Sequence, residues 1–178
     1  MIIFMGVAGS GKSSQGRAIA DERGLPWLST GEFLRMLISG DRRHDMLAGK
    51  LLGDQEVIAL VQKIFTVVDV NEEFVLDGFP RTLAQADWLM NQVKYGQLQV
   101  TAVIHLQASE DVVSKRLLSR GRQDDTAEAI RERFDEYEKE VKPVIEHFKQ
   151  AGTKVIDINA DLSEQEVHGL IDEALNKV

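Results

Sequence analysis

Short apolar runs alternate with amphipathic helical segments along the whole chain. Each run is bounded by Gly, Pro, Asp or Asn, and the five runs are Ile2–Met5, Leu25–Leu28, Phe74–Leu76, Thr101–Leu106 and Lys154–Ile158. Runs that are apolar at successive positions, not at every second one, are typical of strands buried on both faces. Strands that alternate with helices predict an α/β three-layer sandwich: a central parallel five-stranded sheet, right-handed crossovers, and helices on both faces.

Three signals between these runs predict where helices begin and break. Ser29-x-x-Glu32 and Ser163-x-x-Glu166 both have the spacing of a capping box, so we expect a helix after each serine, with Glu32 acting only as the partner of Ser29. An apolar stripe through residues 126–150 predicts a long helix that faces the core. Pro143 should break that helix and open a new first turn.

The composition fits one globular domain that spans residues 1–178. Lys and Arg number 21 against 29 Asp and Glu, a formal charge of −8, which argues against a broad basic face for nucleic acid. An anionic substrate must therefore be held by a local cluster of cations. Cysteine is absent, which excludes disulfides and thiolate zinc sites and suits a cytoplasmic protein. No apolar run is long enough for a membrane span, so we expect no membrane partner.

The segment from Gly6 to Ser13 reads G-V-A-G-S-G-K-S and fits the pattern G-x-x-x-x-G-K-[ST]. A predicted strand precedes it and a predicted helix follows, as the mechanism of a phosphate-binding loop requires. Glycines let backbone amides turn inward around phosphate oxygens, and the helix presents its positive N-terminus to the same charge. Lys12 could reach the β- and γ-phosphates, and the hydroxyl of Ser13 or Ser14 could face Mg²⁺. The loop therefore predicts a nucleoside triphosphate site and a P-loop NTPase fold.

Three further blocks accompany the loop. They are Leu28-Ser-Thr-Gly-Glu-Phe-Leu-Arg35, then Val75-Leu-Asp-Gly-Phe-Pro-Arg-Thr82 with Gln85, and Arg116-Leu-Leu-Ser-Arg-Gly-Arg-Gln-Asp-Asp125 with Arg133. Together and in this order, they resemble the adenylate kinase family of nucleoside monophosphate kinases. The resemblance extends from residue 1 to about residue 175. It implies a P-loop kinase that transfers the terminal phosphoryl group of ATP to AMP, reversibly and with Mg²⁺, to give two ADP.

The resemblance also implies residue roles. The ATP site would consist of Gly9, Ser10, Gly11, Lys12, Ser13, Ser14, Arg116, Arg120 and the backbone near Leu162. The AMP site would consist of Thr30, Arg35, Lys50, Leu51, Leu52, Gly78, Phe79, Pro80, Arg81, Gln85, Arg122 and Arg133. The catalytic cations would be Lys12, Arg81, Arg120, Arg122 and Arg133. Asp77, with Ser13, would hold Mg²⁺ through water, and without cysteines no zinc is expected. A monomer is the usual state of this family.

Other functions remain open at this stage. A UMP/CMP kinase of the same superfamily would typically carry Ala at the position of Thr30 and Asn near Gln85. A kinase of a non-nucleotide metabolite would suit Ser13, which stands where the family usually has Gly. A non-catalytic ATP sensor would keep the loop, but it would not need five arginines converging on a second anion.

Several conspicuous residues have simpler explanations. Asp124 and Asp125 could be paired catalytic carboxylates, but we expect them to orient the neighbouring arginines or cap the next helix. The histidines show no metal-ligand spacing, and Trp27 and Trp88 fit packing better than stacking on a base. The four histidines are His44, His105, His147 and His168.

Two segments are shorter than the family pattern. The arm for the monophosphate, about residues 29–58, should be trimmed, because only residues 36–47 separate Arg35 from Ala48. The lid, about residues 117–127, should be very short, because Gly121 alone separates Arg120 from Arg122. A turn in place of a mobile lid should exclude water from the site less completely.

We therefore expect more ATP hydrolysis per phosphoryl transfer than in a relative with a long lid. The check is to measure ADP formed with and without AMP on one preparation of each enzyme. Equal ratios of hydrolysis to transfer would contradict the expectation.

Overall fold

The computed structural model describes residues 1–40, 53–122 and 125–178. Its five strands form one parallel sheet in the order β2-β3-β1-β4-β5. These strands are β1 (Ile2–Gly6), β2 (Trp27–Ser29), β3 (Val75–Asp77), β4 (Ala102–Gln107) and β5 (Val155–Asn159). The prediction of an α/β protein with a central parallel sheet is confirmed, and every predicted apolar run overlaps a strand that ends one residue beyond it.

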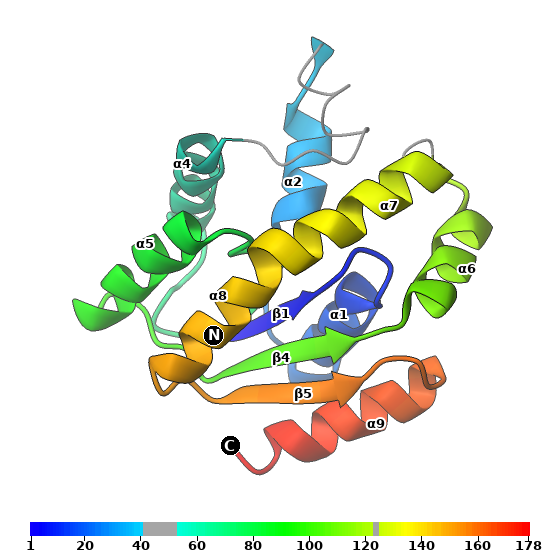
Figure 1. Cartoon of the computed structure of the whole chain (residues 1–178). Helices are drawn as coiled ribbons and strands as arrows, with labels where there is room; N and C mark the ends of the chain where they lie inside the picture. The colour runs from blue at the N-terminus through cyan, green and yellow to red at the C-terminus, as the bar shows by residue number, and fades with distance from the viewer. Residues whose placement is uncertain (41–52, 123–124) are drawn as a thin grey trace.

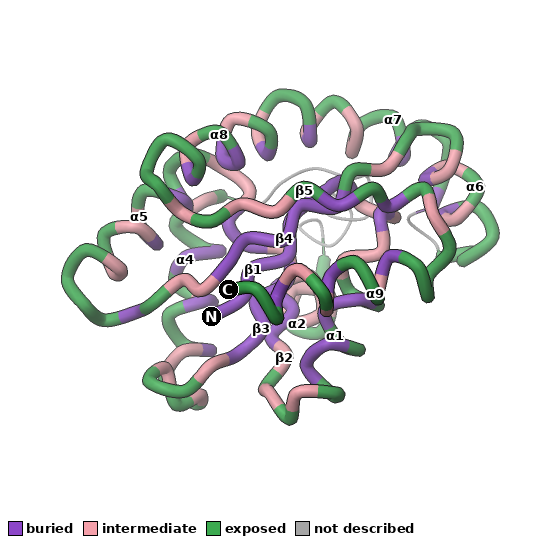
Figure 2. Tube along the Cα trace, turned by 90° about the horizontal axis from the view of Figure 1, so that it is seen from below, coloured by how far each residue is buried: buried purple, intermediate pink, exposed green. Residues whose placement is uncertain are grey.

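Helices cover both faces of the sheet (Figures 1 and 2). One face packs against α1 (Lys12–Arg23) and α9 (Glu164–Leu175). The other packs against α4 (Asp54–Phe65), α5 (Leu83–Lys94), α6 (Glu110–Arg120), α7 (Ala127–Glu136) and α8 (Lys142–Gln150). The remaining helix, α2 (Thr30–Leu37), follows β2 directly and projects above the carboxyl ends of the strands in Figure 1.

Successive residues of each strand contribute to different cores. In β1, Ile3 and Met5 belong to the larger core beneath α4, α5 and α8, whereas Ile2 and Phe4 belong to the core beneath α1 and α9. All four side chains are at most 4% exposed. This explains the continuous apolar run, because a strand covered on both faces buries every side chain.

The long helix of residues 126–150 changes its hydrogen-bond pattern before Pro143. Between α7 and α8 the chain forms a π-helical turn, η1 (Tyr137–Val141), in which the N–H of Lys142 donates to the carbonyl of Tyr137. Pro143 then occupies the first turn of α8, where its missing N–H costs nothing. The predicted new first turn is confirmed, but the predicted break in the helix is wrong. The helical path continues through the wider turn and is not interrupted.

The two predicted capping boxes have different outcomes. At α9 both reciprocal bonds are present: Ser163 accepts from the N–H of Glu166, and Glu166 accepts from the N–H of Ser163. At α2 a helix follows Ser29 as predicted, but the capping box was wrong, because Ser29 makes no side-chain cap and Glu32 lies 3.8 Å from Arg35. Ser29 is still a strand residue, in register with Asp77, so its position is set by the sheet.

No helix of the described residues is long and apolar enough to cross a membrane.

Substituting Ser163 and Ser29 should show that only the first caps a helix with its side chain. Ser163→Ala removes a cap and should lower the melting temperature by about 2–4 °C. Ser29→Ala removes no cap bond and should shift it less. Thermal unfolding of both variants followed by circular dichroism checks this, and equal shifts would contradict it.

Candidate functional site

A cavity of about 530 Å³ lies where β1, β2 and β3 end, between the glycine-rich loop and α7. Parallel strands place their carboxyl ends at one edge of the sheet, and the segments that follow them line the cavity. Of the described residues that line it, seven are Lys or Arg and three are Asp or Glu. The cavity is therefore strongly cationic in a chain whose formal charge is −8.

The glycine-rich loop forms the floor of this cavity. Gly9 and Gly11 have φ values of 89° and 102°, which L side chains rarely adopt, and a Cβ on Gly9 would lie 2.8 Å from Leu117. The loop therefore closes only with glycine at these positions. The helix α1 begins directly after Gly11, with no acidic residue in its first turn, so its positive end faces the cavity.

Lys12 lies folded over the loop, with its Nζ donating to the carbonyl of Val7 at 2.8 Å. Burial lowers the pKa of Lys12 to about 8; the charge of Asp77 opposes this shift, whereas those of Arg81, Arg120 and Arg133 add to it. A dianionic phosphate placed here would reverse the effect and favour the protonated amine. Burial and the neighbouring arginines thus outweigh the charge of Asp77 at Lys12.

Ser13 and Asp77 meet across the cavity floor. The hydroxyl of Ser13 donates to Oδ2 of Asp77 at 2.6 Å, and Asp77 is 2% exposed at the end of β3. These two residues, 64 positions apart, are the pair expected to face Mg²⁺. Hydroxyl and carboxylate oxygens are hard donors of the kind that Mg²⁺ accepts, usually alongside waters and substrate phosphates.

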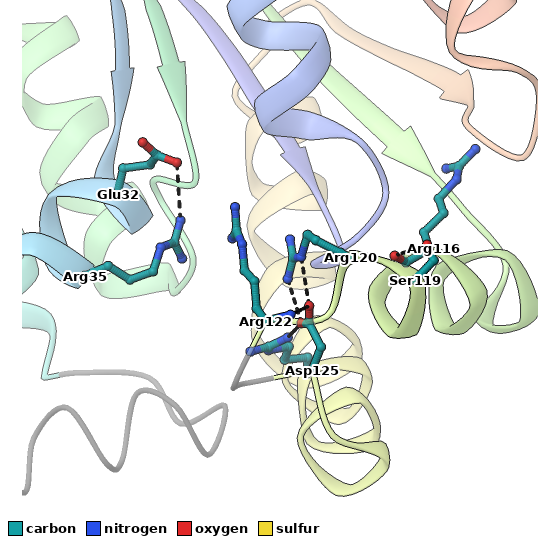
Figure 3. A network of polar contacts seen from close by, with 8 residues as sticks. Glu32, Arg35, Arg116, Ser119, Arg120, Arg122 and Asp125 are labelled. Atoms are coloured by element: carbon teal, nitrogen blue, oxygen red, sulfur yellow. Dashed lines mark hydrogen bonds and ion pairs between the residues drawn. The ribbon is translucent and has the colours of Figure 1, made fainter.

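One carboxylate organises the arginines at the other side of the cavity. Asp125 accepts from Arg120 at 2.7 and 2.9 Å, from Arg133 at 3.1 Å, and from the backbone N–H of Arg122 at 3.2 Å (Figure 3). Its side chain is 1% exposed. Burial alone would raise the pKa of Asp125, but the hydrogen bonds and charges of these arginines outweigh burial and lower it. The expectation that Asp125 orients the arginines is confirmed, whereas Asp124 lies outside the described residues.

Arg35 and Arg116 lie at opposite ends of the cavity (Figure 3). Arg35 extends from α2, on the far side from Arg120 and Arg122 in Figure 3. Arg116 donates to the carbonyls of Ala160 and Leu162, at 2.8 and 3.1 Å. Arg116 and the turn after β5, both expected near the ATP base, are therefore in direct contact.

The structure places most, but not all, of the expected site residues on this cavity. Those that line it are Gly9, Ser10, Gly11, Lys12, Ser13, Ser14, Arg35, Asp77, Gly78, Pro80, Arg81, Arg116, Arg120, Arg122 and Arg133. Those that do not line it are Thr30, Phe79, Gln85 and Leu162. Lys50, Leu51 and Leu52 lie outside the described residues.

The residues behind the cavity wall are engaged in contacts that shape it. The Thr30 hydroxyl lies 3.1 Å from the carbonyl of Asp77 and 2.9 Å from that of Gly78, which fixes the backbone between them. Phe79 is fully buried against Trp88, with ring centroids 6.0 Å apart. Oε1 of Gln85 accepts a hydrogen bond from the backbone N–H of Arg81 at 2.9 Å.

Sequence reasoning missed five polar residues that line the cavity: Gln15, Ser29, Glu136, Tyr137 and Glu164. Helical spacing could have found two of them, because Gln15 follows Lys12 by three positions and Glu136 follows Arg133 by three, on the same helix faces. Nothing local identifies Glu164, which reaches the cavity through the fold of the turn after β5.

His105 and Trp88 contact other protein side chains. His105 is buried, with Nδ1 2.6 Å from Asp157 and Nε2 2.7 Å from the hydroxyl of Tyr137. Among the described residues, no three His, Cys, Asp or Glu side chains are grouped as a metal site. Trp88 is partly buried and packs against Phe65 and Phe79 beside the larger core, as expected of a packing residue. His44 lies outside the described part of the chain.

Comparisons with known proteins agree on one family. The family model described as adenylate kinase matches residues 4–153. An adenylate kinase of Corynebacterium glutamicum is 36% identical over 182 aligned residues, covering 99% of both chains. The adenylate kinase 1 of a Nostoc species is 36% identical over 93% of both chains. An adenylate kinase of Rhodopirellula baltica is 38% identical over 98% of this chain and 94% of its own length.

Removing the charge of Asp125 should destabilise the protein in a pH-dependent way. Asp125→Asn should lower the free energy of unfolding at pH 7 by about 2 kcal/mol, because charged hydrogen bonds to Arg120 and Arg133 are lost. A lowered pKa in the folded state means that this contribution is present above the ordinary value of 3.8 and disappears as pH falls through the folded value.

Urea unfolding of wild type and variant at pH 7 and at pH 3 or below measures this difference. Asp135→Asn, an exposed change on α7, is the matched control and should have little effect at either pH. A difference between wild type and Asp125→Asn that stayed constant into acid would contradict the assignment.

Proposed function

The chain belongs to the adenylate kinase family of nucleoside monophosphate kinases, and on that premise we propose that its cavity transfers the terminal phosphoryl group of ATP to AMP, reversibly giving two ADP. One observation carries the proposal: Lys12, Arg81, Arg120, Arg122 and Arg133 line the same cavity as the glycine-rich loop. A loop that only bound ATP would not require cations on the opposite wall. Their convergence supports a second phosphorylated ligand facing the first.

The chemistry of the reaction explains why cations are needed. Phosphoryl transfer requires little covalent participation by the protein, so catalysis is mostly alignment and stabilisation of charge. Two unit charges ~4 Å apart interact by ~4 kcal/mol at an effective dielectric of 20, but only by ~1 kcal/mol in bulk water. Arginines suit the task because their planar groups hold phosphate oxygens in pairs and stay charged.

In this proposal the two nucleotides lie end to end. The loop amides and Lys12 hold the β- and γ-phosphates of ATP, and Arg116 lies against its base beside the backbone of Leu162. Arg35 and Arg81 hold the phosphate of AMP, and Arg120, Arg122 and Arg133 bridge the two. Thr30 and Gln85 recognise the adenine of AMP, with the backbone of Gly78, Phe79 and Pro80, and Lys50–Leu52 completes that site.

Asp125 would prepare the arginines for this bridge. Its hydrogen bonds hold the guanidinium groups of Arg120 and Arg133 beside the cavity. Little reorganisation is then needed when the phosphates arrive, which is how preorganised charge lowers a barrier.

Mg²⁺ would accompany ATP. Ser13 and Asp77 fit it as oxygen donors on the cavity floor, with Asp77 acting through water. When bound, Mg²⁺ neutralises charge on the β- and γ-phosphates. Residues 29–58 would form the arm for the monophosphate, and residues 117–127 would form a short lid. The protein would be a monomer in the cytoplasm.

The experiment that tests the function compares acceptors. The protein is incubated with MgATP and, separately, AMP, CMP, UMP or shikimate, and ADP production is followed. We expect fast ADP production with AMP only. Preferred use of CMP or UMP would assign the pyrimidine kinase instead, use of shikimate would assign a metabolite kinase, and binding of ATP without any transfer would indicate a sensor.

Arg81→Ala should reduce transfer to AMP at least 100-fold while ATP binding persists, because Arg81 acts on the acceptor phosphate. Arg131→Ala, an exposed change on α7, is the matched control and should retain activity. Steady-state rates together with calorimetric titration of ATP make the measurement. Transfer retained by Arg81→Ala would count against the proposed site.

A further inference from the structure

Asp54 joins two helices behind the cavity. It is the first residue of α4, and its Oδ1 accepts from the hydroxyl of Thr82 at 2.7 Å and from Nε2 of Gln85 at 2.9 Å. Thr82 is the N-cap of α5 and Gln85 lies in the first turn of that helix. One carboxylate oxygen therefore links the start of α4 to the start of α5.

The side-chain amide of Gln85 is held at both ends. Its Nε2 donates to Asp54, and its Oε1 accepts from the backbone N–H of Arg81 at 2.9 Å. A carboxylate can only accept and a backbone N–H can only donate, so the two neighbours dictate which way the amide points. A flipped amide would place Oε1 against the carboxylate and Nε2 against the N–H. Because Gln85 is only 1% exposed, water could not relieve either clash.

The fixed amide retains a defined hydrogen-bonding capacity. Beyond these two bonds, Nε2 keeps one N–H and Oε1 keeps one lone pair. In this orientation the remaining N–H of Nε2 can donate to an acceptor of a base, and the remaining lone pair of Oε1 can accept from a donor beside it. Adenine presents an amino donor at N6 beside an acceptor at N1. Hypoxanthine reverses the order, with an acceptor at O6 beside a donor at N1, and would need the flipped amide.

We propose that Asp54 is a specificity-determining positioning residue: by locking the amide of Gln85, it makes the acceptor site select 6-amino over 6-oxo purine monophosphates. This inference rests on the proposed function, in which Gln85 reads the base of the acceptor nucleotide. Gln85 is one hydrogen bond from Arg81, which lines the cavity. Asp54 itself would touch no substrate and would act only through Gln85.

The test compares AMP with IMP, because the two differ only in the group at position 6 and the protonation of N1. Asp54→Asn keeps the shape of the side chain, but its amide can donate to a flipped Gln85. We expect the ratio of kcat/KM for AMP to kcat/KM for IMP to fall about tenfold, because one of two buried mismatches is relieved. Asp54→Ala removes the carboxylate that fixes the orientation of the Gln85 amide, so it should also lower the ratio of kcat/KM for AMP to kcat/KM for IMP.

Asp111→Asn is the matched control, because it is an exposed carboxylate in the first turn of another helix, α6. It should leave the ratio unchanged. A purely structural role of Asp54 would lower kcat/KM for AMP and IMP by the same factor, and an unchanged ratio in both Asp54 variants would overturn the inference.

Gln85→Leu separates this failure from failure of the proposed function. If Gln85→Leu loses discrimination while the Asp54 variants keep it, Gln85 reads the base and the inference about Asp54 is wrong. If the wild type does not phosphorylate AMP, the proposed function itself is wrong. Loss of discrimination between AMP and IMP in both Gln85→Leu and Asp54→Asn supports the inference that Asp54 fixes the amide of Gln85.

Discussion

Repulsion among the cations that line one cavity is the constraint that organises this molecule. Lys12, Arg81, Arg120 and Arg133 line the same cavity, where burial lowers the pKa of Lys12 and the charges of the three arginines add to that shift. Such a cluster is costly unless negative charge lies close to it. Asp77 and Asp125 supply part of that charge from the sheet and from the start of α7. The remainder is what two phosphorylated nucleotides would bring.

The sheet makes this cluster possible because it holds distant segments in fixed register. The order β2-β3-β1 places the glycine-rich loop next to Asp77, and β2 ends beside β3, in register with it. The long helical path α7–η1–α8 crosses the other side, so Arg133 reaches the cavity while α8 packs on the core. The cations therefore stand on rigid elements, which suits catalysis by alignment.

In the proposed site, specificity and catalysis would be separated in space. The phosphate-facing cations line the cavity, whereas the residues expected to read the acceptor base, Thr30 and Gln85, lie behind its wall and are engaged in hydrogen bonds. Each of these bonds fixes an orientation and satisfies a buried polar group. Selectivity would then come from mismatches that water cannot repair, and not from the strength of any single contact.

Local patterns in the chain were sufficient for the elements and for the kind of chemistry. Continuous apolar runs predicted the strands, the glycine-rich loop predicted phosphate binding, Pro143 predicted a new helical turn, and Ser163 predicted a capped helix. Each depends on residues within a few positions of one another, where backbone geometry and hydrogen bonding are decided by neighbours. All six of the expected arginines line one cavity. Their individual roles are still predictions.

Long-range placement was decided only by the tertiary structure. The strand order, the pairing of Ser13 with Asp77, the shared use of Asp125 and the lock of Asp54 on Gln85 join residues whose spacing carries no signal. The failed capping box at Ser29 shows the reason: a local pattern was present, but the register of β2 with β3 determined the backbone there. Packing of the sheet outweighs a local preference worth about 1 kcal/mol.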